Sequence, residues 1–326
     1  MKQKFLLIAL LSLFTTITSY ADEPLAIKGK PILTIFTNYK AGLGSQNELS
    51  GFNIDRAFIG YGVTLPKGFS AKGIVNTTTK RVDDKMEYDV YLKNIQVDWS
   101  NDKFFASMGL INLMQFSEQE RIWGHRYIFK SFQEEYGFTF CEDVGILAGY
   151  HFADWISMDV AFTNGEGRLF KNTNNDFRYG VGLSIKPTRG LLLRAYFDSY
   201  DDMIGIDGET KDQMSYALFV GYEHKRFTVG AEYNSSYNYQ FAKGKDMRGY
   251  SLYATVPIGK GGGVYGRFDM LKSSNNWESE RAGNMIIAGF DYQPIKQIRI
   301  SPNFQSWKGV NSQRENYLLL SLELKI

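Results

Sequence analysis

Apolar and polar side chains alternate along most of this chain. In residues 57–65, AFIGYGVTL, every odd position is apolar, whereas the even positions hold Phe, Gly, Gly and Thr. Successive side chains of a β-strand point to opposite faces of a sheet, so this period predicts a strand with one apolar face.

The same alternation returns along the rest of the chain. Clear copies lie in residues 69–75, 104–110, 156–162, 179–185, 191–197, 216–222, 227–233, 250–258, 264–270, 286–292 and 298–304, and weaker ones in 31–40, 87–99 and 144–151. In residues 87–99 the apolar parity slips near Asn94, as a β-bulge would make it slip. Together with the last strand, 316–326, the pattern predicts sixteen strands.

The connections between these strands alternate strictly between short and long. Seven are tight, at 66–68, 100–103, 152–155, 187–190, 223–226, 259–263 and 293–297, and eight are longer and polar, at about 41–51, 80–86, 112–142, 164–176, 199–213, 235–248, 273–283 and 308–315. An even number of strands with short turns at one end and long loops at the other is typical of outer-membrane barrels. We therefore predict an all-β fold, a 16-stranded antiparallel transmembrane β-barrel with short periplasmic turns and long external loops.

The last strand, NYLLLSLELKI, keeps apolar residues on one parity up to Ile326. A chain end usually frays because a few residues bury too little surface to offset their ordering entropy. In a barrel this strand would pair with the first one and leave no unpaired edge in lipid. Tyr, Phe and Trp recur at the ends of the apolar stripes, where aromatic rings lie at the headgroup level of a membrane.

The first 21 residues have the features of a signal peptide. Lys2 and Lys4 precede an apolar run from Phe5 to Phe14, and small residues lead to Ala21. The apolar run is too short to span a bilayer as a helix. We expect cleavage after Ala21, export to the outer membrane of a Gram-negative bacterium, and a single barrel domain over residues 22–326.

Charge and cysteine content exclude several classes of protein. Removing Lys2 and Lys4 from the 37 Lys and Arg residues leaves 35, against 35 Asp and Glu residues, so the exported chain is neutral and no nucleic-acid partner is expected. One cysteine, Cys141, cannot form an internal disulfide. The three histidines show no spacing of metal ligands. Without a Ser-His-acid arrangement we expect no enzyme, no metal and no cofactor.

The stretch from 104 to 167, FFASMGLINLMQFSEQERIWGHRYIFKSFQEEYGFTFCEDVGILAGYHFADWISMDVAFTNGEG, resembles the outer-membrane porin superfamily around the phosphate-selective porin O and P family. That resemblance implies a passive channel, a homotrimer, and a long loop that folds into the barrel. It also implies contact with outer-membrane lipids, lipopolysaccharide and the barrel assembly machinery. Such barrels commonly end in Phe or Trp, whereas this chain ends in Ile326.

The third long connection, 112–142, is the candidate constriction loop. Its helix-compatible and charge-dense sequence supplies the candidate constriction residues Arg121, His125, Arg126, Lys130, Glu118 and Glu120. Folded inward, the loop would narrow the lumen, and its basic residues would concentrate anions there. The alternative is an external loop whose charges are only hydrated.

Strand parity also predicts which charged side chains face the lumen. The candidate pore-lining residues are Arg56, Lys72, Arg178, Arg194, Arg267, Arg299, Asp159, Asp198, Glu232 and Asp269. Acidic and basic side chains are nearly balanced, which indicates transverse fields like those of general diffusion porins rather than a filter of one sign. Phosphate specificity therefore stays open.

The predicted function is that of an outer-membrane porin, a passive aqueous channel for small hydrophilic solutes, with anions such as phosphate among the candidates. One alternative is a barrel with a plugged lumen that acts as an adhesin or surface-binding protein. Another is an exported soluble β-rich protein that binds glycans, with the apolar parity buried between two sheets.

Overall fold

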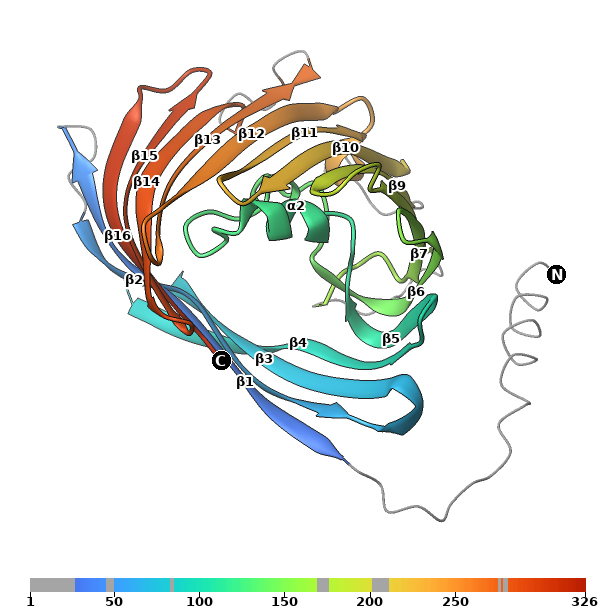
Figure 1. Cartoon of the computed structure of the whole chain (residues 1–326). Helices are drawn as coiled ribbons and strands as arrows, with labels where there is room; N and C mark the ends of the chain where they lie inside the picture. Colours follow the sequence, from blue (N-terminus) through green and yellow to red (C-terminus); the bar gives the residue numbers. More distant parts are fainter. Residues whose placement is uncertain are drawn as a thin grey trace.

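The computed structural model describes residues 27–44, 50–82, 85–168, 176–200, 211–274, 277 and 281–326. Sixteen antiparallel strands form one closed barrel, in which each strand pairs with its neighbours in the chain and β1 pairs with β16 (Figure 1). The predicted fold is thereby confirmed. The predicted signal peptide lies outside the described residues.

The strands begin and end close to the predicted bounds. They are β1 (Lys28–Leu43), β2 (Ser50–Thr64), β3 (Phe69–Val82), β4 (Lys85–Ser100), β5 (Phe104–Asn112), β6 (Glu142–Ala153), β7 (Ile156–Thr163), β8 (Arg178–Ile185), β9 (Leu191–Tyr200), β10 (Gln213–His224), β11 (Phe227–Tyr237), β12 (Met247–Ile258), β13 (Gly262–Ser273), β14 (Gly283–Ile295), β15 (Ile298–Gly309) and β16 (Glu315–Lys325). The helical elements are α2 (Ser117–Trp123), α3 (Phe132–Glu135) and the 3-10 turns η1 (Pro66–Gly68) and η2 (Tyr239–Phe241). None of the helices in the described part of the chain has the length and apolar character needed to cross a membrane.

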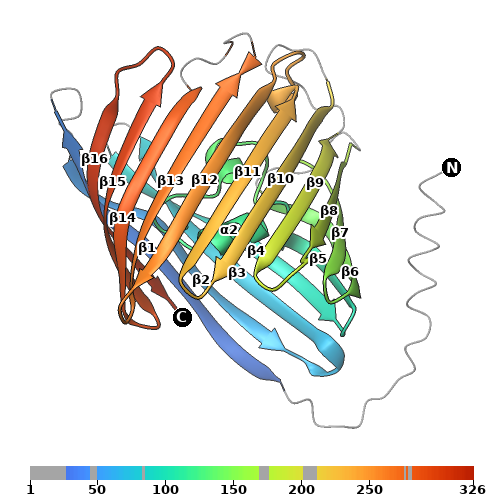
Figure 2. The same cartoon turned by 45° about the horizontal axis from the view of Figure 1, so that its top comes forward.

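The short turns gather at one end of the barrel together with the C-terminus (Figure 2). The tight turn between β2 and β3 depends on Gly68, which has a φ of 81°. A Cβ atom there would lie 2.0 Å from the carbonyl oxygen of Ser100. Only glycine fits this backbone conformation so close to the next strand end.

The two ends of the described chain close the barrel. The backbone N–H of Ile326 donates to the carbonyl oxygen of Leu33 at 2.8 Å, and the N–H of Leu33 donates to the carbonyl oxygen of Ile326 at 3.3 Å. The final residue is thus held by a reciprocal pair of hydrogen bonds. The predicted pairing of the last strand with the first is confirmed, and the sheet has no free edge.

The outer surface of the barrel is apolar. Side chains at the predicted outward positions are exposed, for example Leu218 at 53%, Leu252 at 58% and Leu320 at 52%. Side chains of the opposite parity point inward, and many of them are polar, as in Ser215, Ser251 and Ser321. A sheet with an apolar outside and a polar inside is the reverse of a soluble barrel and is typical of barrels surrounded by hydrocarbon.

One β-bulge interrupts the regular register between β3 and β4. Ile74 pairs with Asn94, whereas Val75 pairs with Leu92, so Lys93 is the extra residue. The predicted slip near Asn94 is confirmed. Because of the bulge, two consecutive polar side chains, Lys93 and Asn94, both reach polar groups inside the barrel.

The chain between β5 and β6, residues 113–141, lies inside the barrel and carries α2 and α3 (Figure 1). We call it the inner segment. Its residues Ile122, Trp123, Tyr127 and Ile128 form an apolar cluster with inward side chains of the wall, among them Phe36, Leu192, Phe219, Tyr253, Tyr265 and Ile287.

A second apolar cluster joins the inner segment to the barrel near the long connections. It packs Phe132, Tyr136 and Phe138 against Tyr239, Met247 and Leu271. These two clusters hold the inner segment against the wall. Packing of large apolar groups on both sides of this contact removes them from water and stabilises the folded position.

Candidate functional site

Three cavities follow one another through the barrel beside the inner segment. The short-turn cavity, of about 800 Å³, is lined at its outer end by the turn residues Gly259, Gly261 and Lys296. The middle cavity, of about 610 Å³, shares Arg299, Glu323 and Lys325 with it. The long-loop cavity, of about 460 Å³, shares Phe36, Arg56 and Arg126 with the middle one. Each cavity therefore adjoins the next in a series of three inside the barrel.

Each cavity has two more basic than acidic side chains in its lining. The short-turn cavity has Lys30, Lys296, Arg299 and Lys325 against Asp291 and Glu323. The middle cavity has Arg56, Lys93, Arg121, Arg126, Arg299 and Lys325 against Glu120, Glu134, Glu142 and Glu323. The long-loop cavity has Lys40, Arg56, Arg126 and Lys130 against Asp55 and Glu135. An excess of fixed positive charge in a narrow, low-dielectric passage raises the local concentration of anions.

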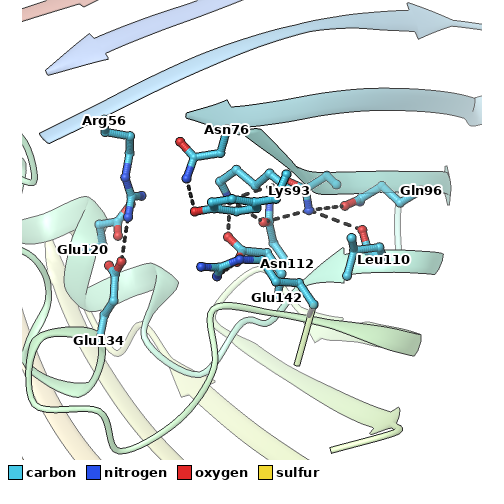
Figure 3. A network of polar contacts seen from close by, with 12 residues as sticks. Arg56, Asn76, Lys93, Gln96, Leu110, Asn112, Glu120, Glu134 and Glu142 are labelled. Atoms are coloured by element: carbon cyan, nitrogen blue, oxygen red, sulfur yellow. Dashed lines mark hydrogen bonds and ion pairs between the residues drawn. The ribbon is translucent and has the colours of Figure 1, made fainter. Parts of the chain in front are cut away.

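A chain of ion pairs joins the wall to the inner segment at the boundary of the middle and long-loop cavities. Arg56 on β2 lies 3.0 Å from Glu134 on α3. The same carboxylate accepts a hydrogen bond from Arg126, whose guanidinium also lies 3.0 Å from Glu120 on α2. Arg56, Glu120 and Glu134 are drawn in Figure 3, which shows the wall side chain reaching across to the inner segment. This chain of charges therefore lies where the middle and long-loop cavities adjoin.

The two carboxyl groups in this chain titrate differently. Burial raises the pKa of Glu120, and the opposing effect of Arg126 does not cancel it. Burial acts on Glu134 in the same direction, but Arg126 and Arg56 outweigh it, so the pKa of Glu134 lies below its usual value. Glu120 is therefore the first of the two to take up a proton as the pH falls.

The bulge residue Lys93 forms a second set of polar contacts in the middle cavity (Figure 3). Its ammonium group forms an ion pair with Glu142 and lies 3.3 Å from the amide oxygen of Asn112. Arg168 donates to the other oxygen of Glu142 at 2.9 Å. Lys93 was not among the sequence-predicted site residues. The parity slip beside Asn94 was the signal that could have revealed it.

Five of the six predicted constriction residues are distributed over the three cavities rather than gathered in one ring, and Glu118 lines none of them. Arg121 lines the middle cavity, half exposed, with Glu118 at 2.9 Å and Glu223 at 2.7 Å. His125 is buried beside the short-turn cavity, with Nε2 at 3.3 Å from Asp291. Lys130 lines the long-loop cavity, 3.6 Å from Glu135. Arg126 and Glu120 belong to the chain of ion pairs described above.

Several inward charged residues do not line the passage, because the inner segment covers them. Arg178 is fully buried, forms an ion pair with Asp198 at 2.6 Å and also donates to the side-chain oxygen of Gln115. Arg194 forms two hydrogen bonds with Asp159, at 2.7 and 3.0 Å, and donates to the carbonyl oxygen of Met114 at 3.1 Å. Gln115 and Met114 both belong to the inner segment.

Two further arginines contact the inner segment in the same way. Arg267 is paired with Asp269 at 2.7 and 2.8 Å and donates to the carbonyl oxygen of Lys130 at 2.8 Å. Arg299 is paired with Asp291 at 2.8 Å and donates to the carbonyl oxygen of Gly124 at 2.5 Å. We call Arg178, Arg194, Arg267 and Arg299 the clamp arginines. A guanidinium suits this task because its planar fork can bind a carboxylate and still donate to another oxygen.

The pore-lining prediction is therefore wrong for all seven residues that it names on β7–β13. Arg178, Arg194, Arg267, Asp159, Asp198, Glu232 and Asp269 are each at most 6% exposed, and none lines any of the three interior cavities. Lys72 on β3 is half-buried and lies outside these linings too. Arg56 and Arg299 line the middle cavity. Parity correctly places these side chains on the inner face, but it does not show what covers them.

Solved structures share the fold of this chain. No protein-family model matches the sequence, and no curated protein is similar to it. Among solved structures, OmpF of Salmonella typhi in complex with daunomycin superposes with a TM-score of 0.69 at 11% identity, over 92% of this chain and 98% of that one. OprB of Pseudomonas putida gives 0.66 at 6% identity, over 91% and 94%, and an anion-selective porin from Comamonas acidovorans gives 0.64 at 10%, over 92% and 100%. The chain thus has the fold of outer-membrane porins, while the resemblance to the porin O and P family stays a prediction.

Proposed function

We propose that this protein is an outer-membrane channel that passively admits small hydrophilic solutes and weakly favours anions. The observation that carries the proposal is the series of three cavities along the barrel, each with an excess of two basic side chains. Solutes would move down their own gradient, so the proposal includes no catalytic step.

The proposed location rests on the apolar outer surface. Its strands are 8 to 16 residues long, and a tilted strand needs about 9–11 residues to cross the hydrocarbon. The exterior is apolar, and the backbone hydrogen bonds run between neighbouring strands all round the barrel. The barrel is therefore suited to a bilayer and poorly suited to water. Export through a cleaved peptide of residues 1–21, assembly by the barrel machinery and a homotrimeric state belong to this proposal as well.

The arrangement of charges favours a general channel over a phosphate filter. In the middle cavity, Arg56 faces Glu134 and Lys93 faces Glu142, so cations of the wall are opposed by carboxylates. A dehydrated phosphate would have to compete with these carboxylates for the same donors. We therefore propose a modest preference for anions as a class. The plugged-barrel alternative is not favoured, because the cavities lie in series.

Planar-bilayer recording in a salt gradient tests the proposed function. Purified protein should produce stepwise conductance. The sign of the reversal potential should show that anions permeate more readily than cations. Replacing Arg121 and Arg126 by Ala should shift the reversal potential toward cations, because both guanidinium groups line the middle cavity. A bilayer that shows no steps at any protein concentration would contradict the channel. An unchanged potential in the double variant would contradict the role of the inner segment.

A further inference from the structure

The connections at the two ends of the barrel carry opposite charge. The seven short connections between strands hold eight Lys and Arg residues against two acidic ones, Asp102 and Asp154. The eight long connections hold ten basic against seventeen acidic residues. The short-turn end is therefore positive by six charges in its connections, although the exported chain as a whole is neutral.

Half of these short-turn cations lie in two neighbouring turns. Lys186 and Arg189 belong to the β8–β9 connection, and Lys225 and Arg226 to the β10–β11 connection. The turns touch, because the backbone N–H of Glu223 donates to the carbonyl oxygen of Gly190 at 2.9 Å. All four side chains are exposed.

We call these four residues the turn cations. Glu223, the acidic residue that leads into the β10–β11 turn, does not neutralise them. The carboxylate of Glu223 lies 2.7 Å from Arg121 of the inner segment. In the described part of the chain, no ion pair engages the four turn cations. The cluster therefore presents four charges to the surroundings of the barrel.

An apolar groove of about 500 Å³ lies on the outer face of β8–β12, directly beyond these turns; β9–β12 face the viewer in Figure 2. Its outward side chains are Leu183, Leu193, Leu218, Val220, Tyr233 and Tyr250. The hollow arises where two alanines stand among larger neighbours. Ala195 pairs with Leu183 and Leu218, and Ala231 pairs with Val220 and Leu252.

The groove and the turn cations are continuous along the strands. Ile185, at the lower end of the groove, directly precedes Lys186, and Leu193 is four residues from Arg189. At about 3.3 Å per residue, Val220 lies roughly 17 Å along β10 from Lys225. An apolar channel of this length that ends in four cations matches the shape and charge of a lipid with an anionic headgroup.

We propose that the outer face of β8–β12 binds one anionic glycerophospholipid. The phosphate lies among the turn cations, and an acyl chain lies in the groove over Ala195 and Ala231. Each Lys or Arg near an anionic lipid surface contributes attraction that weakens with salt. This inference rests on the proposed placement of the barrel in a membrane.

Fluorescence quenching by brominated lipids tests the site. Trp155 is a suitable reporter, because it is 54% exposed and its carbonyl oxygen accepts a hydrogen bond from the N–H of Lys186 at 2.7 Å. The fluorescence of Trp155 is obtained by subtracting the fluorescence of the Trp155→Phe variant from that of the wild-type protein. Both are placed in phosphatidylcholine vesicles that contain brominated phosphatidylglycerol or brominated phosphatidylcholine. We expect phosphatidylglycerol to be preferred several-fold and the preference to fall in high salt.

Matched variants separate the site from general charge effects. K186Q/K225Q removes two of the four turn cations and should lower the relative association constant of phosphatidylglycerol toward that of phosphatidylcholine. K28Q/K103Q removes two exposed lysines elsewhere at the short-turn end and should leave the constant unchanged. A195F fills the hollow and should lower the preference without altering any charge. Equal losses in both lysine pairs, or no effect of A195F, would overturn the proposal.

Two further outcomes are decisive. In the first, both lipids quench Trp155 only weakly, and the quenching increases when the protein is diluted in the bilayer. That result would show that a second copy of the chain covers the groove, and it would overturn the lipid assignment. Conductance recorded from the same preparation keeps the two proposals apart. Channel steps without lipid preference would reject only the lipid site, whereas lipid preference without steps would support the lipid site and reject only the channel.

Discussion

Arg56 on β2 and Glu134 on α3 are joined by an ion pair of 3.0 Å that connects the barrel wall to the inner segment. Glu134 also binds Arg126, so one carboxylate balances two guanidinium groups. The carboxylate is 8% exposed. Its charge therefore acts on the passage with less screening than a surface charge would.

Replacing Glu134 by Gln should make the channel more selective for anions. The side chain keeps its size, while the excess of basic side chains in the middle cavity rises from two to three. We expect the anion-to-cation permeability ratio to increase on the order of two-fold through fixed-charge focusing. Reversal potentials in a salt gradient measure this ratio. D154N, which removes an exposed carboxylate from a short turn, is the control and should change the ratio far less.

Replacing Lys93 by Gln should have the opposite effect. Lys93 lines the middle cavity and is paired with Glu142, so its removal leaves that carboxylate balanced by Arg168 alone. The reversal potential should move toward cations. Lys72→Gln on the neighbouring strand is the matched control, because Lys72 faces inward but lies outside the cavity linings. Equal shifts of the reversal potential in the Lys93 and Lys72 variants would show that Lys93 has no special influence on selectivity.

Mild acid should increase anion selectivity through Glu120. Burial raises the pKa of this carboxyl group, so it is protonated at a pH above its ordinary range, whereas Arg126 and Arg56 keep Glu134 charged to lower pH. As the pH falls, Glu120 takes up a proton before Glu134 does, so the middle cavity loses one negative charge and becomes more positive. Reversal potentials measured as the pH is lowered should show the change in the wild-type channel. In E120Q the dependence should largely vanish, and a retained dependence would assign it to another group.

Breaking one clamp should destabilise the folded protein. Arg267→Met leaves Asp269 buried without its partner, and such a loss typically costs about 3–5 kcal/mol. The double variant R267M/D269L should be closer to the wild type, because no charge is left buried. Denaturant unfolding in detergent, followed by gel mobility with and without heating, measures the difference. R189Q, at an exposed turn, serves as the control and should leave stability unchanged within about 0.5 kcal/mol.

The strands were predictable because their signal is local. Alternation over residues such as 57–65 reports the two faces of a strand directly, and the strict alternation of connection lengths reports the two ends of the barrel. The bulge beside Asn94 was also predictable, because the parity of the apolar positions changes there. Closure by Ile326 followed from an apolar stripe that continues to the end of the chain.

The lining of the passage was not predictable in the same way. Parity correctly turns Arg194 and Arg267 inward, but their burial depends on where the inner segment packs. That packing is decided by contacts between residues far apart in the chain, such as Trp123 with Tyr253, whose ring centres are 5.2 Å apart. No local pattern encodes such a contact. Inward-facing charged residues such as Arg194 and Arg267 would line an empty barrel. In this structure they hold the inner segment in place instead.

The reciprocal hydrogen bonds between Leu33 and Ile326 also bear on biogenesis. Because the seam of the barrel joins β1 to β16, the strands farthest apart in the described chain, the wall cannot close before β16 is in place. A truncation of only the last few residues should therefore weaken the seam between β1 and β16 at the short-turn end.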